Sequence, residues 1–382
     1  MDPTFIVAAC IAVKVFKQPP IVAVLFCYNK DMKILLFTHD LSTIGGIETS
    51  FFQLAQYLKK TGHNVGVRFG VSPSLQLHRY KEAGINISQE RNETCDVLLI
   101  GSVWRQPKMI AAKLTVQQIH ADWSDKFWNG AGSGLQRIHT ADSNVDMYAC
   151  VSESAASFVR KATKKQVIVM NNLAPVKSVV KRSKGDKVVF GAFTRMTAEK
   201  GLKNYQAFRE RVLDLGINAE FKIFTSGDAP DGWEHNEPVK DIKIVFSGVD
   251  YVVSLADTES FGYTIAEANS CGIPCIIKRC NSTKEFFSDK DNLILDDVQD
   301  FDKKSLKLKV SSYTLREMTE ASVGEAMSIF NGMIKGRQLL KVMRPYWDIK
   351  SRKQRSIGEV FSADKERAKE LLNNEHNIVE EL

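Results

Sequence analysis

Residues 251–271 read Tyr-Val-Val-Ser-Leu-Ala-Asp-Thr-Glu259-Ser-Phe-Gly-Tyr-Thr-Ile-Ala-Glu267-Ala-Asn-Ser-Cys. The run Tyr251–Leu255 is short and apolar and predicts a buried strand, whereas the stretch from Tyr263 onward predicts a helix. Ligands of open α/β sheets bind beyond the carboxyl ends of the strands. Glu259 therefore lies at a predicted binding edge, and Glu267, about one turn into the helix, can face the same cleft.

The loop between these glutamates is suited to an anion or to hydroxyl groups. Four amides between them point out of a helix N-terminus, where they lack intrahelical partners and the helix dipole favours negative charge. They belong to Ser260, Phe261, Gly262 and Tyr263. Gly262 also lets a ligand approach the backbone closely. Two glutamates alone would favour the simpler interpretation of a solvated turn, so the surrounding sequence decides.

The alternation of strand and helix continues on both sides of this segment. Before it, the predicted strands are Lys33–Thr38, Val65–Phe69, Asp96–Ile100, Val116–Ile119, Ala149–Ser152 and Val167–Met170. In the second half of the chain they are Val188–Phe193, Phe221–Phe224, Ile242–Phe246, Tyr251–Leu255 and Pro274–Lys278. The predicted helices include Ile47–Lys60, Tyr205–Leu215 and Tyr263–Cys271. This pattern predicts parallel sheets covered by helices on both faces, arranged as two Rossmann-like, doubly wound domains that face a cleft.

The domain boundaries follow from where the pattern stops and restarts. Residues 32–175 form the first domain, 176–187 a basic linker, 188–340 the second domain, and 341–382 C-terminal helices that are expected to pack back on the first domain. Residues 1–31 are expected to lie outside the core fold. Their apolar pieces are interrupted by Lys14, Lys17 and Pro19-Pro20 and are each too short to span a bilayer. A membrane-surface anchor and an extra strand are the alternatives for this extension.

The composition is that of a globular protein and excludes several classes. The chain has 382 residues, 44% of them hydrophobic and 25% charged, which fits two domains. Its net charge of +7 is spread out, without a dense basic stripe, so nucleic acid is not expected as a partner. Peripheral contact with the inner membrane face is left open by this charge. The seven cysteines include no C-x-x-C pair, which predicts reduced thiols and a cytoplasmic protein without a metal site.

The stretch Asp257–Ile277 resembles the E-x7-E signature of retaining GT-B glycosyltransferases. It is most similar to the large glycosyltransferase family 4 (group 1), including the Cys271-Gly-Ile-Pro274 segment that follows the second glutamate. The resemblance implies a nucleotide-diphosphate sugar as donor. It implies that Glu259 and the loop after it, through Tyr263, hold the donor sugar and diphosphate, and that Glu267 binds the ribose. The family commonly has glycine where this chain has Ser260, which leaves the identity of the donor open.

Three further segments resemble elements of the same family. Arg195 and Lys200-Gly201 match its R-x4-K-G element, which clasps the donor pyrophosphate; two cations at a strand end suit a departing diphosphate. Gly45 and Gly46 match a G-G-x-E turn that opens the first domain, and His120 matches a histidine near the reacting sugar. The implied catalytic residues are Arg195, Lys200, Glu259 and His120. The implied donor-binding residues are Gly45, Gly46, Ser260, Phe261, Gly262, Tyr263 and Glu267.

The resemblance implies a retaining glycosyltransferase of the hexosyltransferase type, which moves a sugar to a hydroxyl of a glycan, a lipid-linked molecule or a protein. No pair of carboxylates suited to a hydrolase-like route can be named. The resemblance implies instead an attack on the same face as departure, in which the leaving diphosphate helps to deprotonate the acceptor hydroxyl. No cofactor or metal is expected, because the Asp289-Lys-Asp291 sequence lies in a late polar loop typical of a turn. The alternatives are a nucleotide-sugar epimerase of GT-B fold and a non-catalytic subunit that partners a glycosyltransferase.

Overall fold

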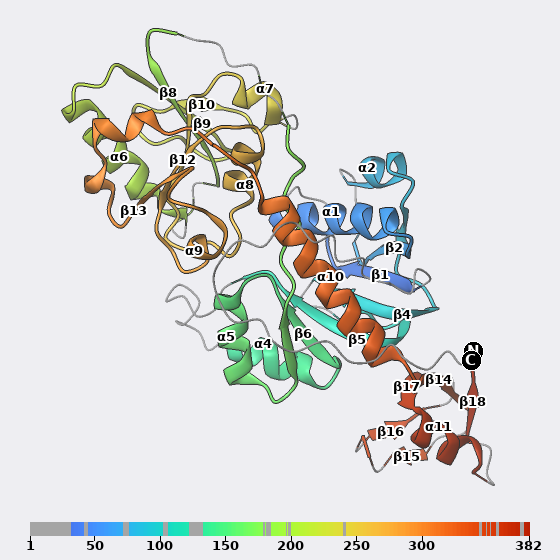
Figure 1. Cartoon of the computed structure of the whole chain (residues 1–382). Coiled ribbons are helices and arrows are strands. Elements are labelled where there is room, and N and C mark those ends of the chain that lie inside the picture. Colours follow the sequence, from blue (N-terminus) through green and yellow to red (C-terminus); the bar gives the residue numbers. More distant parts are fainter. Residues whose placement is uncertain are drawn as a thin grey trace, which may run out of the picture.

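The computed structural model describes residues 32–382 except for a set of short stretches. These are 42–44, 72–75, 102–105, 122–132, 179, 181–184, 196, 198–199, 240–241, 344–345, 349, 352, 357–358 and 375–377. The predicted extension of residues 1–31 lies outside the described residues. The described chain forms two parallel sheets with their helices, followed by a small unit at the C-terminus (Figure 1). No helix in the described ranges is long and apolar enough to cross a membrane.

The first domain is built on a parallel seven-stranded sheet of order β3-β2-β1-β4-β5-β6-β7. The strands are β1 (Lys33–Thr38), β2 (Asn64–Phe69), β3 (Asn86–Gln89), β4 (Glu93–Ile100), β5 (Ile110–Ile119), β6 (Met147–Cys150) and β7 (Gln166–Val169). Alternate residues of β1 face opposite layers. Leu36 joins a core that contains helix α1 (Gly46–Lys60), whereas Leu35 joins a core that contains α5 (Glu153–Ala162).

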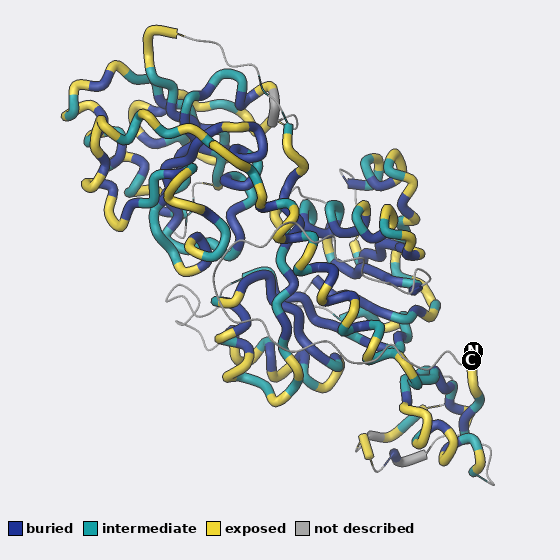
Figure 2. Tube along the Cα trace, in the orientation of Figure 1, coloured by how far each residue is buried: buried dark blue, intermediate teal, exposed yellow. Residues whose placement is uncertain are grey.

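The second domain repeats this topology. Its six strands are parallel in the order β10-β9-β8-β11-β12-β13, with β8 (Val188–Phe193), β9 (Ala219–Phe224), β10 (Glu234–Asn236), β11 (Tyr251–Ser254), β12 (Cys275–Lys278) and β13 (Leu293–Leu295). Helix α6 (Leu202–Asp214) packs on one face of the sheet and α8 (Tyr263–Ser270) on the other. Buried residues follow the strands of both domains, and exposed residues line the outer helix faces (Figure 2). The prediction of two Rossmann-like domains is confirmed.

One predicted strand of the second domain is wrong. Residues Ile242–Phe246 form the short helix α7 instead of a strand. Only Val245 and Phe246 of its last three residues are buried, while Ile244 is 67% exposed. A five-residue apolar run does not distinguish a strand from a helical turn by its periodicity.

The C-terminal prediction needs two corrections. Helix α10 (Leu315–Ile334) lies within the predicted second domain, but its residues Val323, Met327 and Phe330 belong to the core of the first domain. Figure 1 shows α10 running along the first domain toward the C-terminal unit.

The second correction is that the unit after α10 is mostly strand rather than helix. It contains β14 (Arg337–Val342), β15 (Tyr346–Asp348), β16 (Lys353–Arg355), β17 (Val360–Asp364), α11 (Lys365–Leu372) and β18 (Val379–Glu381). Strands β14, β17 and β18 form an antiparallel sheet whose apolar side chains, among them Leu340 and Phe361, pack on α11. The strands are short and rich in charge, so their alternation was not visible. The unit contacts β5, where the Lys113 carbonyl accepts hydrogen bonds from Arg337 and Ser362.

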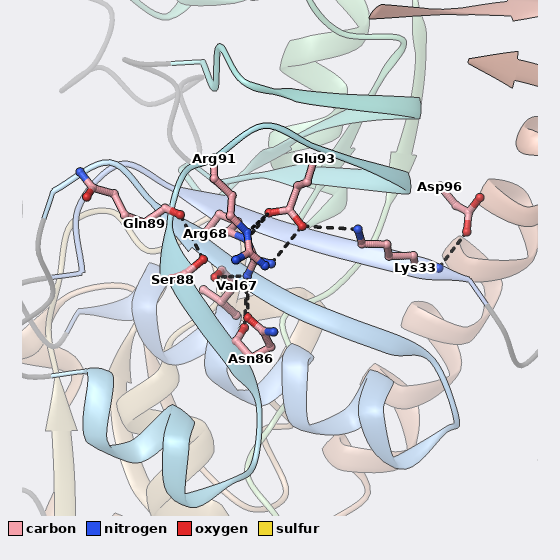
Figure 3. Close-up of polar contacts among 9 residues, drawn as sticks. All are labelled: Lys33, Val67, Arg68, Asn86, Ser88, Gln89, Arg91, Glu93 and Asp96. Carbon is pink, nitrogen blue, oxygen red and sulfur yellow. Dashed lines mark hydrogen bonds and ion pairs between the residues drawn. The ribbon is translucent and has the colours of Figure 1, made fainter. Parts of the chain in front are cut away.

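A buried ion pair connects β2 and β4, the two strands that flank β1 in the first sheet (Figure 3). The side chain of Arg68 is 2% exposed. Its guanidinium donates two hydrogen bonds to Glu93, and the one from Nη2 has a length of 3.0 Å. Gly66 leaves room for this guanidinium, because a Cβ there would lie 3.0 Å from its Nη1. Burial opposes ionisation of Glu93, but the Arg68 guanidinium holds the pKa of that carboxyl below its usual range. Lys33 lies on the other side of the same carboxylate, at 3.4 Å.

Candidate active site

The structure brings Lys200 and Glu259 together at the point where the strand order of the second sheet reverses. Lys200 follows β8, Glu259 follows β11, and these two strands are neighbours. The Nζ of Lys200 lies 3.0 Å from Oε2 of Glu259. Their side chains are 21% and 22% exposed, so the pair is partly shielded but still accessible to a ligand. Ligands of doubly wound sheets bind at this switch point.

Gly201 fixes the position of Lys200. Its φ of +73° is a left-handed value that L-residues disfavour. A Cβ at this position would lie 2.3 Å from the carbonyl oxygen of Leu255, the residue directly after β11. The side chain of Asn204 binds the same carbonyl at 2.8 Å. The loop after β8 is therefore held against the loop after β11.

The backbone of Glu259 is anchored from the loop after β12. The hydroxyl of Ser282 donates a hydrogen bond to the carbonyl oxygen of Glu259, and the Sγ of Cys280 lies 3.9 Å from the same oxygen. Thr283 closes this turn, since its Oγ1 accepts from the amide of Cys280 and donates to the carbonyl of Cys280. Nothing in the sequence pattern had indicated these residues.

Phe261 and Gly262 shape the loop through packing and backbone angles. The Phe261 side chain is buried in the core of the second domain against Phe286, with 4.8 Å between ring centroids. Only its backbone is therefore left for a ligand. Gly262 precedes α8 with a φ of +81°, and a Cβ there would lie 3.1 Å from both Ile265 and Phe287.

Tyr263 points from the second domain into the first. A Cβ on Gly46, the first residue of α1, would lie 3.9 Å from the Tyr263 ring. Burial raises the pKa of the Tyr263 hydroxyl well above its usual range, and an interaction with the Ser50 hydroxyl works against this shift. The Ser50 hydroxyl in turn donates a hydrogen bond to Oδ1 of Asn172 at a distance of 2.6 Å. This places the Tyr263 side chain between the domains, and the role of the Tyr263 amide in donor binding stays a prediction.

His120 follows β5 and lies directly beside the loop of residues 255–262 that connects β11 to α8, which we call the donor loop after its predicted role. Its carbonyl oxygen accepts a hydrogen bond from the Ser260 hydroxyl at a distance of 2.5 Å. Its ring packs edge-on against Phe51, with centroids 5.9 Å apart. Neither ring nitrogen has a well-aligned hydrogen bond among the described residues. Burial lowers the pKa of His120 to about 4, despite an opposing interaction with Asn172, so the ring is neutral at pH 7.

Glu267 lies in the second turn of α8. Its carboxylate makes no hydrogen bond or ion pair with the described part of the chain, and its burial raises its pKa to about 7. A shielded carboxylate without a partner is costly for the fold and available to a ligand's hydroxyl groups.

Arg195 of the second domain interacts electrostatically with Glu48, which lies in the first turn of α1 after Gly45 and Gly46. Arg195 is exposed, and its charge acts on Glu48 of the first domain. Glu48 caps α1, because its Oε2 accepts from the amide of Gly45 at 3.0 Å. Desolvation nevertheless raises the pKa of the Glu48 carboxyl. No group of three or more His, Cys, Asp or Glu side chains in the described ranges could hold a metal ion. The expectation of metal-free chemistry stays a prediction.

Comparison with known proteins agrees with this architecture. Residues 233–325 match the family model of group 1 glycosyl transferases. Anabaena HepE in complex with UDP and glucose superposes with a TM-score of 0.59 at 13% identity, over 80% of this chain and 98% of HepE. TarM of S. aureus superposes with a TM-score of 0.62 at 9% identity, over 79% of this chain and 98% of TarM. No curated protein sequence matches the chain.

A third similar structure is sucrose-phosphate synthase from Thermosynechococcus elongatus, with a TM-score of 0.52 at 12% identity, over 80% of this chain and 94% of the synthase. At such low identities the likeness establishes the fold, which is GT-B. This fold and the matched segment together support a glycosyltransferase. The matched segment is that of group 1, and it contains both Glu259 and Glu267.

Proposed function

We propose that the chain is a retaining glycosyltransferase of family 4 that transfers a hexose from a nucleoside-diphosphate sugar to a hydroxyl acceptor. The observation that carries this proposal is the Lys200–Glu259 pair at the switch point, with the unpartnered Glu267 carboxylate on the following helix. This arrangement supplies a cation for the diphosphate and two carboxylates for hydroxyl groups.

Each residue has a role that follows from its chemistry. Lys200 and the exposed Arg195 bind the diphosphate and stabilise the negative charge that develops on it as the glycosidic bond breaks. Glu259 accepts hydrogen bonds from sugar hydroxyls, and Glu267 from the ribose. When the donor binds, the Lys200 ammonium exchanges part of its contact with Glu259 for a phosphate oxygen. Transfer then depends mostly on positioning, with the departing diphosphate taking the acceptor proton on the same face.

The neutral His120 ring belongs to the first domain, which is the predicted acceptor domain, and its backbone is bonded to Ser260. Because its pKa is lowered to about 4, it does not place a positive charge beside the sugar at pH 7. It can donate one hydrogen bond and accept another, which suits a sugar hydroxyl. Replacement of His120 by Asn is therefore expected to reduce transfer less than replacement by Ala.

The donor can be identified by thermal shift against UDP-, GDP- and dTDP-sugars. UDP-glucose is the first compound to test, because HepE was solved in complex with it. A donor at a concentration of 100 times its Kd stabilises the folded protein by about 2.7 kcal/mol. No shift with any nucleotide sugar would contradict the proposal and support a non-catalytic subunit.

Reactions without an acceptor separate transfer from epimerisation. A transferase is expected to leave the sugar nucleotide unchanged or to hydrolyse it slowly, whereas an epimerase converts it to an isomeric sugar nucleotide. The proposed mechanism needs no metal, so transfer is expected to continue in the presence of EDTA. A loss of activity that Mg²⁺ or Mn²⁺ restores would overturn that part of the proposal.

A further inference from the structure

The first helical turn of α5 in the first domain is bound by a carboxylate of the second domain. Glu285, in the short helix α9 (Thr283–Phe286), accepts from the amide of Glu153 at 2.7 Å and from the amide of Ser154 at 2.9 Å. Each carboxylate oxygen takes one amide. The two amides are 132 and 131 residues away from Glu285 in sequence, so the contact joins the domains.

These amides belong to the first two residues of α5. The first residues of a helix leave their N–H groups unpaired. The Ser152 side chain caps α5 by accepting from the amide of Ala155 at 3.2 Å, and Glu285 accepts from the amides of Glu153 and Ser154. A carboxylate at this position also interacts favourably with the helix dipole. The cap of α5 is thus completed by the other domain.

Glu285 is closely connected to the donor loop. It follows Ser282 by three residues, and Ser282 donates to the carbonyl oxygen of Glu259. The amide of Glu285 bonds back to the Ser282 carbonyl at 3.0 Å, which makes the turn compact. The connection therefore runs from α5 through Glu285 and Ser282 to Glu259.

A cavity of about 450 Å³ opens beside this contact. It is lined from the first domain by Glu153, Ser154, Ser157, Phe158 and Lys161, and from the second domain by Asn281. Asn281 lies between the two residues whose side chains reach the Glu259 carbonyl. The cavity keeps this shape only while α5 and the turn after β12 stay together.

We propose that Glu285 is a positioning residue that couples the closure of the two domains to the placement of Glu259. A donor bound to the second domain reacts with an acceptor only when the first domain is close to it. The carboxylate of Glu285 stabilises this closed arrangement with two charge-assisted hydrogen bonds and holds the turn that anchors Glu259. Its effect on transfer rests on the proposed function, whereas its effect on the interdomain contact does not.

Two variants on opposite sides of the contact test this coupling. Glu285→Ala removes the carboxylate from the second domain. Glu153→Pro removes one donor from the first domain; proline is favoured at the first helical position, and the preceding Ser152 is extended, with φ −150° and ψ 159°. Glu153→Ala is the matched control, because it removes the same side chain but keeps the amide. Glu210→Ala, an exposed glutamate of α6, controls for the loss of a charge.

The decisive readout is hydrogen exchange of peptides covering residues 256–264, measured by mass spectrometry without any ligand. Exchange there is expected to accelerate by about tenfold in Glu285→Ala and to a smaller extent in Glu153→Pro, but not in either control. An effect of Glu153→Pro on the second domain cannot arise from a local change in α9. Unchanged exchange in Glu153→Pro would overturn the proposal.

Kinetics then separate this coupling from the proposed function. With the identified donor, Glu285→Ala is expected to lower kcat about tenfold and to change the Kd of the donor less than threefold. If exchange responds as expected but no transfer is found in the wild-type protein, the coupling stands and the proposed function fails. A normal kcat in Glu285→Ala with accelerated exchange would remove the link to catalysis.

Discussion

The hydroxyl of Ser260 in the second domain donates a hydrogen bond to the carbonyl oxygen of His120 in the first domain, at a distance of 2.5 Å. Members of glycosyltransferase family 4, which the sequence resembles, commonly have glycine at this position, and glycine has no hydroxyl to make this bond. The donor loop is thus held to the first domain by a side chain, one residue after Glu259. Tyr263, the first residue of α8, lies near Gly46 and Ser50 of the first domain, so the predicted donor site lies at the domain boundary.

Ser260→Ala tests the contribution of this bond. Loss of one interdomain hydrogen bond costs about 1 kcal/mol, so kcat/KM is expected to fall about fivefold in a transfer assay. Ser226→Ala, at an exposed serine of the same domain, is expected to have no effect. Wild-type kinetics for both variants would show that the bond is unimportant.

Gly201→Ala is expected to destabilise the second domain by about 2–4 kcal/mol, from the left-handed backbone and from the clash with Leu255. It should also displace Lys200 and lower activity more than stability alone explains. Gly216→Ala is the matched control: its φ is +66°, but no atom lies within 4 Å of the added Cβ. It is expected to cost about 1 kcal/mol. If thermal unfolding shows the same loss of stability in Gly201→Ala and in Gly216→Ala, the close contact of Gly201 with Leu255 is contradicted.

Glu93→Gln is expected to lower stability by about 3–5 kcal/mol, because it leaves the buried Arg68 uncompensated. The pKa of Glu93 is lowered in the folded state, so the pair stabilises the wild type above the usual pKa near 4.5 and loses this effect as pH falls through the lowered value. The stability gap between wild type and variant should therefore narrow below pH 4.5. Arg91→Ala, which removes an exposed cation 3.6 Å from Glu93, is expected to cost less than about 1 kcal/mol.

Glu267→Gln is expected to show the opposite pH dependence. Burial raises the pKa of Glu267 to about 7, so the wild type must bury a charged carboxylate as pH rises from the usual value near 4.5 through 7. The glutamine variant should be more stable than wild type by about 3 kcal/mol at pH 8 and about equally stable at pH 4.5. Thermal unfolding at the two pH values measures this difference. A stability difference between wild type and Glu267→Gln that does not depend on pH would mean that the Glu267 carboxyl has its usual pKa.

The sequence predicted those parts of the site that depend on topology alone. Glu259 and Lys200 each follow a strand, and neighbouring parallel strands bring their carboxyl ends to one edge, so their proximity could be expected. Contacts between the domains were not predictable in this way. Glu285, Ser260 and Tyr263 meet their partners in the first domain only because the two domains approach in one orientation, which leaves no periodicity in the sequence.

The errors in the fold have a related physical cause. The strands β15, β16 and β18 have three residues each, which is too short for alternation to appear. The apolar face of α10 resembles that of any second-domain helix, and only the three-dimensional structure shows that it covers the first sheet. Local pattern thus identified neither the strands of the C-terminal unit nor the domain on which α10 packs.

The central claim is that Lys200 and Glu267 belong to one donor site, and calorimetric titration with the nucleotide sugar tests it most directly. The wild type is expected to bind the donor, and Lys200→Ala and Glu267→Ala are expected to bind about 10- to 100-fold more weakly, each with a wild-type circular dichroism spectrum. Glu210→Ala should bind as the wild type does. Unchanged affinity in both Lys200→Ala and Glu267→Ala would contradict the account.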